Sequence, residues 1–271
     1  MKELCNIFRV RGGIGDALLA CCKMKTIAQR NKNIKNVLII SEETIMASNV
    51  MSIYEYIIFI DQIIVTSLIN NNHKEQVFGK YSPIHKIIDQ FHPDSKKFDL
   101  NFNSDLMSKI ESTALTLEEI QLSNKETSDY ICIQPRSRQL YTRDRRRDWN
   151  SFLKFAKIIY EKTGYKSVIL GSKNDGLNNI KNEYIVNLAG KKTLRESMKL
   201  ILNSRAMVGT TSWSPLFAAI FKIPCIHINA VDLTPIFLQL FEDMGGNFNI
   251  SMYSANSEVA FLANKLIKII G

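Results

Sequence analysis

The sequence predicts an α/β protein built from two doubly wound parallel sheets. Three observations support this fold class. Short apolar runs alternate with helical patterns in both halves of the chain, turns that contain glycine or hydroxyl residues follow several of these runs, and the alternation restarts after a polar stretch at 123–129. A chain of 271 residues is long enough for two such domains. We therefore expect domains at 1–126 and 127–271.

The first half begins with an apolar strand at 6–10, a glycine turn at Gly12–Gly15 and a helix from about Asp16. Small and apolar residues at helical spacing predict the buried face of that helix, namely Ala17, Ala20, Cys21, Met24 and Ala28. Further strands are expected at 37–41 and 57–60. Strand, helix and strand in this order imply parallel pairing with a right-handed crossover.

The second half repeats the alternation more completely. Strands are expected at 130–134 and 167–171, followed by a short strand that ends near 188. Two more are expected at 206–209 and 225–229. Helices are expected at 150–163, after a capping box formed by Thr193 and Glu196, after Ser214, and at 257–270. The last helix either completes this domain or packs back on the N-terminal one.

Composition limits the class of partner. The formal net charge of +9 favours an anionic partner such as nucleic acid, a phospholipid surface, a phosphorylated glycan or a nucleotide. Five cysteines form no CxxC pair, which favours a reducing cytoplasm over a disulfide framework. We expect no signal peptide and no transmembrane segment, and therefore a cytoplasmic protein, with a peripheral position at the inner membrane surface as an alternative.

The turn after the first strand reads Arg11-Gly-Gly-Ile-Gly-Asp16. Gly12, Gly13 and Gly15 let the backbone approach a ligand closely, and a helix N-terminus favours negative charge. Asp16 is interpreted in two compatible ways, as the N-cap of the helix and as an ionised carboxylate that takes a proton from a hydroxyl group. Leu18 stands where a dinucleotide fingerprint needs a small residue, although Glu42 keeps a nicotinamide enzyme as an alternative.

Two further segments suit phosphate groups. An arginine-rich segment follows the strand at 130–134 and contains Arg136, Arg138, Arg143, Arg145, Arg146 and Arg147, whose guanidinium groups bind phosphate bidentately or grip a nucleic-acid backbone. The segment Gly209–Pro215 places the hydroxyl groups of Thr210, Thr211, Ser212 and Ser214 between a strand and a helix. Ser214 and Pro215 also fit plain N-cap and N1 positions. His85 and His92 lack the closely spaced partners of a metal site, so no metal is expected.

Together these segments resemble glycosyltransferase family 9, the lipopolysaccharide heptosyltransferases with the GT-B fold. The resemblance rests on four segments, which are Phe8–Leu19, Ile131–Gln134 with Arg147-Asp148-Trp149, Val168–Gly171, and Asn187–Lys191 with Leu194. It covers residues 1–40 and 130–230. Thr211, Trp213 and Leu216 stand where the family has aspartate, glycine and histidine, which leaves the identity of the donor open.

The resemblance implies a GT-B-like pair of facing Rossmann-like sheets, with a shortened N-terminal acceptor-binding domain and a C-terminal nucleotide-sugar-binding domain. It implies inverting, metal-independent sugar transfer without a cofactor, with Asp16 as the general base. The implied donor-binding residues are Arg136, Arg145, Arg147, Gly171, Lys191, Thr210, Thr211, Ser212 and Ser214. The implied acceptor is an anionic cell-surface glycan or a lipid-linked glycan of the lipopolysaccharide type.

Two alternatives remain open. The net charge, the arginine cluster and the short acceptor domain also fit a phage-type DNA glycosyltransferase that acts on a modified base, in which case nucleic acid binds the basic face. The departures at 211–216 also fit a non-catalytic protein that binds nucleotides or nucleic acid.

Overall fold

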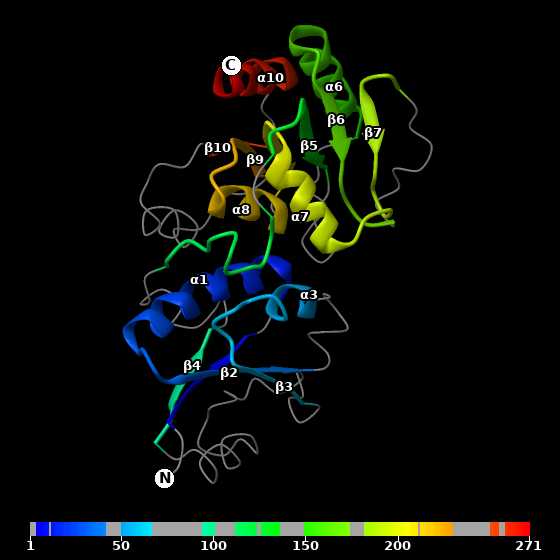
Figure 1. The fold of residues 1–271 in the computed structure, drawn as a ribbon. Helices are drawn as coiled ribbons and strands as arrows, with labels where there is room; N and C mark the ends of the chain where they lie inside the picture. The colour runs from blue at the N-terminus through cyan, green and yellow to red at the C-terminus, as the bar shows by residue number, and fades with distance from the viewer. Residues whose placement is uncertain are drawn as a thin grey trace. The chain divides into compact units, whose positions relative to one another are not determined.

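The computed structural model describes residues 4–10, 12–41, 50–66, 94–100, 112–123, 126–135, 149–173, 182–210, 212–229, 250–254 and 258–271. The chain divides into two compact units, Met1–Leu122 and Ser123–Gly271. Each unit contains a parallel β-sheet with α-helices, coloured blue to green and green to red in Figure 1. No helix in the described ranges is both long and apolar enough to cross a bilayer.

The first unit is built on a four-stranded sheet in the order β3-β2-β1-β4. Its elements are β1 (Cys5–Arg9), α1 (Ile14–Arg30), β2 (Lys35–Ser41), α3 (Met51–Tyr54), β3 (Gln62–Thr66) and β4 (Lys96–Asp99). All the pairings are parallel. The rings of Phe8 on β1 and Phe98 on β4 stack with centroids 5.3 Å apart. The chain moves outward from β1 to β2 and β3 and then returns to the other side of β1, so its direction reverses between β1 and β4.

Helix α1 is buried on every face over its middle turns. All residues from Ala17 to Ile27 are buried, including Lys23 and Lys25. The segment 112–122 covers part of the helix, because the backbone N–H of Thr113 donates to the carbonyl of Cys22 at 3.2 Å. Lys25 Nζ donates to the carbonyl of Ala114 at 2.6 Å and to Glu119 Oε2 at 2.8 Å, which satisfies a charge that burial would otherwise leave unpaired.

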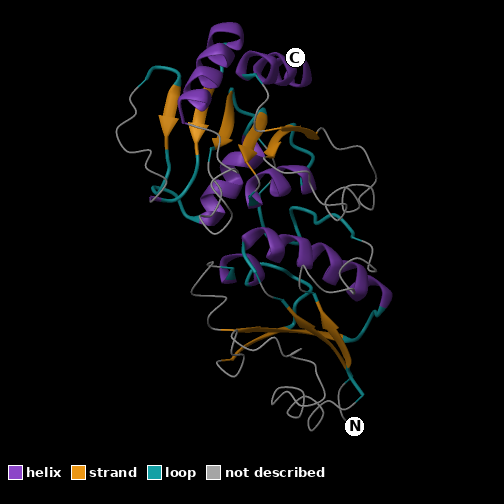
Figure 2. Cartoon of the chain, turned by 180° about the vertical axis from the view of Figure 1, so that it is seen from behind, coloured by secondary structure: helices purple, strands orange, loops and turns teal. Residues whose placement is uncertain are grey.

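The second unit is built on a six-stranded sheet in the order β10-β9-β8-β5-β6-β7, seen from behind as the orange strands in the upper part of Figure 2. Its strands are β5 (Tyr130–Gln134), β6 (Lys166–Ile169), β7 (Ile185–Asn187), β8 (Ala206–Thr210), β9 (Cys225–Asn229) and β10 (Ile250–Ser254). Its helices are α6 (Trp149–Thr163), α7 (Leu194–Asn203), α8 (Trp213–Ile220) and α10 (Val259–Ile270). Here the direction reverses between β5 and β8.

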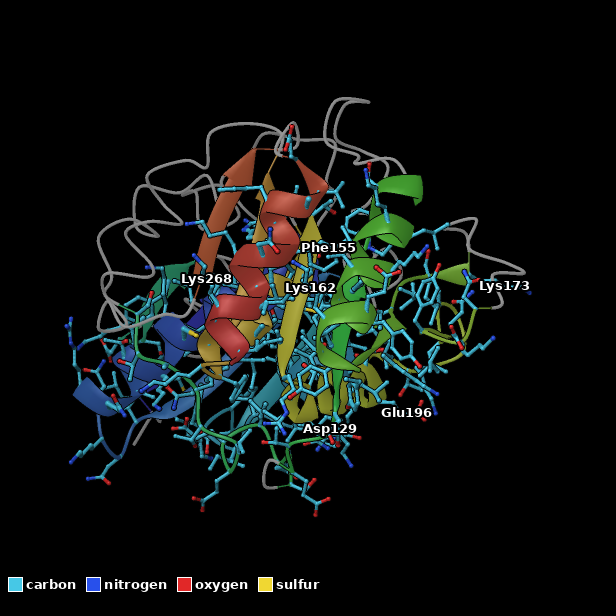
Figure 3. All side chains as sticks on the ribbon, turned by 90° about the horizontal axis from the view of Figure 1, so that it is seen from above. Asp129, Phe155, Lys162, Lys173, Glu196 and Lys268 are labelled. Atoms are coloured by element: carbon cyan, nitrogen blue, oxygen red, sulfur yellow. The ribbon has the colours of Figure 1, made fainter. Side chains whose placement is uncertain are left out.

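One hydrophobic core holds α6 and α10 against this sheet. It joins Ile131 and Ile133 of β5 to Phe155 and Ile159 of α6 and to Leu266 of α10. Figure 3 shows α10 beside α6, where Lys162 Nζ donates to Asn264 Oδ1 at 2.8 Å. The last helix therefore packs within the second unit.

Three expectations about local structure need correction, and two strands were missed. The strand expected at 57–60 is a turn, and β3 begins at Gln62, because the backbone N–H of Ile58 donates to the carbonyl of Glu119 instead of joining the sheet. Asp16 is not the N-cap of α1, because Gly13 holds that position. Ser214 and Pro215 are not the N-cap and N1 residues of α8, because Ser212 is the N-cap. Strands β4 and β10 were not expected.

Candidate functional site

The Gly12–Asp16 turn lies where the direction of the first sheet reverses. It follows β1, and the residue after the neighbouring strand β4, Leu100, donates its N–H to the carbonyl of Arg9 at 2.8 Å. In open α/β sheets, ligands bind at the carboxyl ends of the strands at such a reversal. The turn that the sequence singles out is therefore in the position where this fold class places its ligands.

Asp16 holds this turn together through its carboxylate. It is the third residue of α1, and its Oδ2 accepts a hydrogen bond of 2.7 Å from the backbone N–H of Gly13. Gly12 has a φ of +108°, and a Cβ atom there would lie 2.3 Å from Asp16 Oδ2. Only glycine leaves room for the carboxylate at this point. The requirement for Gly12 thus comes from the position of Asp16.

Burial raises the pKa of Asp16 above its ordinary value of 3.8. The hydrogen bonds from the N–H groups of Gly13 and of Asp16 itself lower this pKa, but burial has the larger effect. The expectation that the helix N-terminus favours the ionised form agrees in direction with the effect of these two N–H groups, and burial opposes it. A carboxylate with a raised pKa is a stronger base than an ordinary exposed aspartate.

The carboxyl ends of four strands bring the donor-binding candidates of the second unit to one edge of its sheet. Gln134 ends β5, and Thr210 ends the neighbouring β8, so both lie at the reversal between these strands. Gly171 follows β6, and Lys191 follows β7. Gln134, which the sequence analysis did not single out by itself, is buried at the register position opposite Gly209.

The loops that carry Gly171 and Lys191 pack closely together. The N–H of Gly190 donates to the carbonyl of Gly171 at 2.8 Å, and Gly190 has a φ of +69°. A Cβ atom at Gly190 would lie 2.6 Å from the Cα of Lys173, so this contact also requires glycine. Lys191 is exposed and its Nζ donates to the carbonyl of Asn187 at 2.9 Å.

The hydroxyl groups near α8 are largely covered. Thr210 is 1% exposed, and its Oγ1 has no hydrogen-bond partner among the described residues. Ser212 Oγ and Ser214 Oγ lie 3.2 Å apart and share a hydrogen bond, with Ser214 fully buried. A Cβ atom at Gly209 would lie 3.0 Å from Pro215 Cγ, so glycine allows α8 to approach β8. Donor binding by these residues stays a prediction.

Several candidates fall outside the part of the chain that the structure describes. These are Arg11, Glu42, His85, His92, Thr211 and the arginine-rich segment from Arg136 to Arg147. Within the described ranges, no three histidine, cysteine, aspartate or glutamate side chains come together in a metal-binding arrangement. All five cysteines are buried free thiols.

Comparison with solved structures identifies the architecture. The ADP-heptose lipopolysaccharide heptosyltransferase II of Escherichia coli is similar over 98% of each chain, with a TM-score of 0.62 and 12% sequence identity. A family 9 glycosyltransferase from Veillonella parvula is similar over 100% of this chain and 98% of its own, with a TM-score of 0.64 and 10% identity. The chain has a GT-B-like fold.

The same GT-B-like fold extends to another class of nucleotide-sugar enzyme. The UDP-GlcNAc 2-epimerase of Methanocaldococcus jannaschii is similar over 99% of this chain and 91% of its own, with a TM-score of 0.54 and 14% identity. No protein-family model matches the sequence, and no curated protein sequence matches it. The expected likeness to family 9 heptosyltransferases is therefore confirmed at the level of the fold.

Proposed function

We propose that this protein is a glycosyltransferase that moves a sugar from a nucleotide-sugar donor to a hydroxyl group of a lipopolysaccharide-type glycan. The observation that carries the proposal is the placement of Asp16. A half-buried carboxylate with a raised pKa occupies the strand-reversal turn of a GT-B-like fold, held there by Gly12 and Gly13. The similarity to heptosyltransferases supports a lipopolysaccharide-type acceptor.

In the reaction that we propose, Asp16 is the general base. Its carboxylate takes the proton from the acceptor hydroxyl, whose oxygen forms a bond to the anomeric carbon of the donor sugar. The bond from that carbon to the diphosphate breaks, and the nucleoside diphosphate leaves with the electron pair. A single displacement of this kind inverts the configuration at the anomeric carbon.

The donor is assigned to the strand-reversal edge of the second sheet, between β5 and β8. Support comes from the strand order, because ligands of doubly wound sheets bind at such an edge. The segment after β5 carries Arg136, Arg145 and Arg147, and α8 begins at Trp213, close after the end of β8 at Thr210. Guanidinium groups and helix N-terminal amides stabilise the negative charge that grows on a leaving diphosphate, and we propose that they do so without a metal ion.

Donor binding is tested by thermal unfolding of the purified protein with nucleoside diphosphates and nucleotide sugars. A ligand present at about one hundred times its dissociation constant adds about 2.7 kcal/mol of stability. We expect one nucleoside diphosphate and its sugar conjugates to raise the melting temperature selectively. A shift only with a nicotinamide cofactor or with duplex DNA would overturn the transferase proposal.

Catalysis is tested by Asp16→Asn in a transfer assay with the donor so identified. The variant keeps a side-chain oxygen that accepts from Gly13, so we expect unchanged donor binding and a fall in turnover of at least about a hundredfold. Asp129→Asn is the matched control, because Asp129 is exposed and pairs only with Arg205 at 2.9 Å among the described residues. Turnover of Asp16→Asn close to that of the parent would rule out Asp16 as the base.

A further inference from the structure

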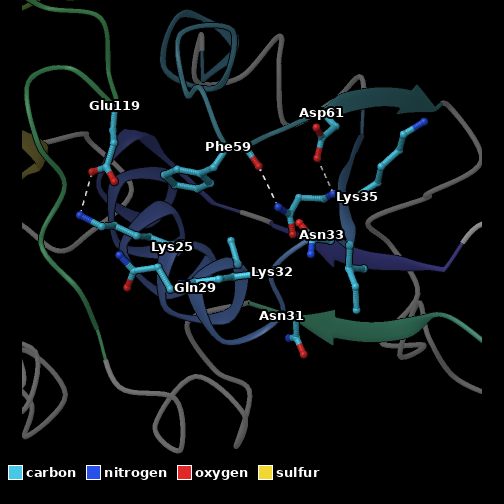
Figure 4. Close-up of a pocket in the computed structure, with 12 residues that line it drawn as sticks. Lys25, Gln29, Asn31, Lys32, Asn33, Lys35, Phe59, Asp61 and Glu119 are labelled. Carbon is cyan, nitrogen blue, oxygen red and sulfur yellow. Dashed lines mark hydrogen bonds and ion pairs between the residues drawn. The ribbon is translucent and has the colours of Figure 1, made fainter.

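An open pocket of about 520 Å³ lies at the far end of α1 from Asp16, where α1, the start of β2 and the turn before β3 meet. Figure 4 shows the ring of Phe59 in this pocket, between the Lys25–Glu119 pair on one side and Asp61 with Lys35 on the other. Helix α1 has 17 residues, so at about 1.5 Å per residue the pocket lies roughly 20 Å along the helix from Asp16. It is therefore separate from the candidate catalytic turn.

The walls of this pocket are fixed by a set of hydrogen bonds. Asn36 donates its backbone N–H to Asp61 Oδ2 at 2.7 Å and its Nδ2 to the carbonyl of Phe59 at 3.0 Å. The carbonyl of Asn36 accepts from the N–H of Asp61 at 2.9 Å, and the carbonyl of Glu119 accepts from the N–H of Ile58 at 3.1 Å. The turn that presents Phe59 is thus held from both sides. A pocket held in this way loses little freedom when a ligand binds.

Several polar groups in this pocket remain available to a ligand. Within the described ranges, the amides of Gln29 and Asn33 and the ammonium group of Lys32 have no hydrogen-bond partner, and all three side chains are exposed. Glu119 uses Oε2 to accept from Lys25 and from the N–H of Thr116, which leaves Oε1. Asp61 uses Oδ2 for Asn36, which leaves Oδ1. The free groups therefore include both donors and acceptors around a half-exposed aromatic ring.

We propose that this pocket binds one sugar residue of a glycan. Sugar hydroxyl groups donate and accept at once, and amides and carboxylates at several points match both needs. The C–H face of a pyranose ring packs on an aromatic ring, whose π face is negative. The lining is of mixed charge, with Lys25, Lys32 and Lys35 beside the carboxylates of Asp61 and Glu119, so it matches the paired donors and acceptors of a sugar better than a group that only accepts. The assignment of this sugar to the acceptor glycan rests on the proposed transferase function, whereas sugar binding itself does not.

The test is a two-dimensional 1H–15N NMR titration of the full chain, in the absence of any donor, with maltotriose, cellotriose and chitotriose, and separately with inorganic phosphate. We expect at least one trisaccharide to shift the side-chain amide signals of Gln29 and Asn33 saturably, with a dissociation constant on the order of 1 mM. No response to any of the three at about 10 mM would overturn the proposal. So would tighter binding of phosphate at the same signals.

Variants separate the pocket from the rest of the surface. Phe59→Ala removes the ring and keeps the backbone carbonyl that Asn36 uses, so we expect binding to weaken at least about tenfold. Ile58→Ala is the matched control, because Ile58 is 54% exposed, precedes Phe59 and does not line the pocket.

If Phe59→Ala does not fold, the exposed double variant Gln29→Ala/Lys32→Ala serves, with an expected loss of several-fold. Undiminished binding by both pocket variants would contradict the proposal. Because no donor is present, a failure of sugar transfer would not alter these outcomes.

Discussion

The carboxylate Oδ2 of Asp16 accepts a hydrogen bond of 2.7 Å from the backbone N–H of Gly13, three residues earlier. This bond closes the turn after β1 and leaves the carboxylate half-buried at the strand reversal. It connects the backbone geometry of the glycine turn with the protonation of the proposed base. Substitution of a glycine should change the position of the carboxylate, whereas substitution of Asp16 should remove its charge.

The acid side of the rate–pH profile should report Asp16. Because burial raises its pKa above 3.8, we expect kcat/KM to fall on acidification with a midpoint above that value. Measurement of kcat/KM between about pH 4 and pH 8 checks this, because kcat/KM reports the pKa of the free enzyme, with the small residual activity of Asp16→Asn as the control. An inflection below the ordinary pKa, or an identical acid limb in the variant, would contradict the assignment.

The same raised pKa gives Asp16 a predictable effect on stability. Between the unfolded and the folded pKa the folded state binds more protons, so the free energy of unfolding falls as pH rises through this window. Asp16→Asn removes this cost. We therefore expect the variant to be at least as stable as the parent at pH 7 in chemical unfolding, with the difference shrinking towards pH 3. A variant much less stable at neutral pH would show that the charged carboxylate stabilises the turn.

Gly12 and Gly13 form a matched pair for mutagenesis. An alanine Cβ at Gly12 would lie 2.3 Å from Asp16 Oδ2 at a φ of +108°, whereas at Gly13 it would lie 3.8 Å away in extended backbone. We expect Gly12→Ala to displace the carboxylate and to lower turnover at least about tenfold, and Gly13→Ala to retain most activity. Equal activities of the two variants would contradict the steric argument.

The start of α7 offers a test of local stability. Thr193 Oγ1 accepts from the N–H of Glu196 at 3.2 Å, and the N–H of Thr193 donates to Glu196 Oε2 at 2.8 Å. We expect Thr193→Ala to lower the free energy of unfolding by about 1 kcal/mol. Lys192→Ala, which removes only the exposed ion pair with Glu196, should cost less than about 0.5 kcal/mol. Urea unfolding of both variants measures the difference.

His227 on β9 should make the fold sensitive to acid. The side chain is 4% exposed, and burial lowers its pKa to about 4 from an ordinary 6.5. Between these values the unfolded state binds the proton and the folded state does not, so stability is present above pH 6.5 and is lost as pH falls towards 4. We expect His227→Gln to flatten the dependence of the unfolding free energy on pH in this window. An unchanged slope would assign the acid sensitivity to other groups.

The second sheet was predictable from sequence because its strands are short apolar runs buried on both faces, such as 130–134 and 206–209. β4 was missed because Lys96, Lys97 and Asp99 give it no apolar pattern, and only pairing with β1 makes it a strand. β3 was misplaced by five residues, because Ile57 is buried in a turn whose hydrophobicity resembles that of a strand. Pairing with strands that are distant in the sequence determines where β3 and β4 form, and no local sequence pattern encodes that pairing.

The residues of the candidate site were predictable from the sequence, but their contacts were not. Asp16 and its glycines could be chosen because they lie between a strand and a helix, but their mutual contact depends on the φ of Gly12, which sequence does not give. The pocket around Phe59 was not predictable. Its lining combines α1, β2 and residues 59, 61 and 119, which come together only when the first sheet has formed.

Helix α1 has no solvent-facing side between Ala17 and Ile27. An ordinary surface helix can exchange its outer residues freely during evolution, but this one cannot. In a saturation-mutagenesis library, the periodic tolerance expected of an amphipathic helix should be replaced by uniform intolerance along this stretch. Engineers who wish to attach a label or vary the surface of this protein should therefore leave residues 17–27 unchanged and work on exposed positions such as those at the ends of α6 and α10.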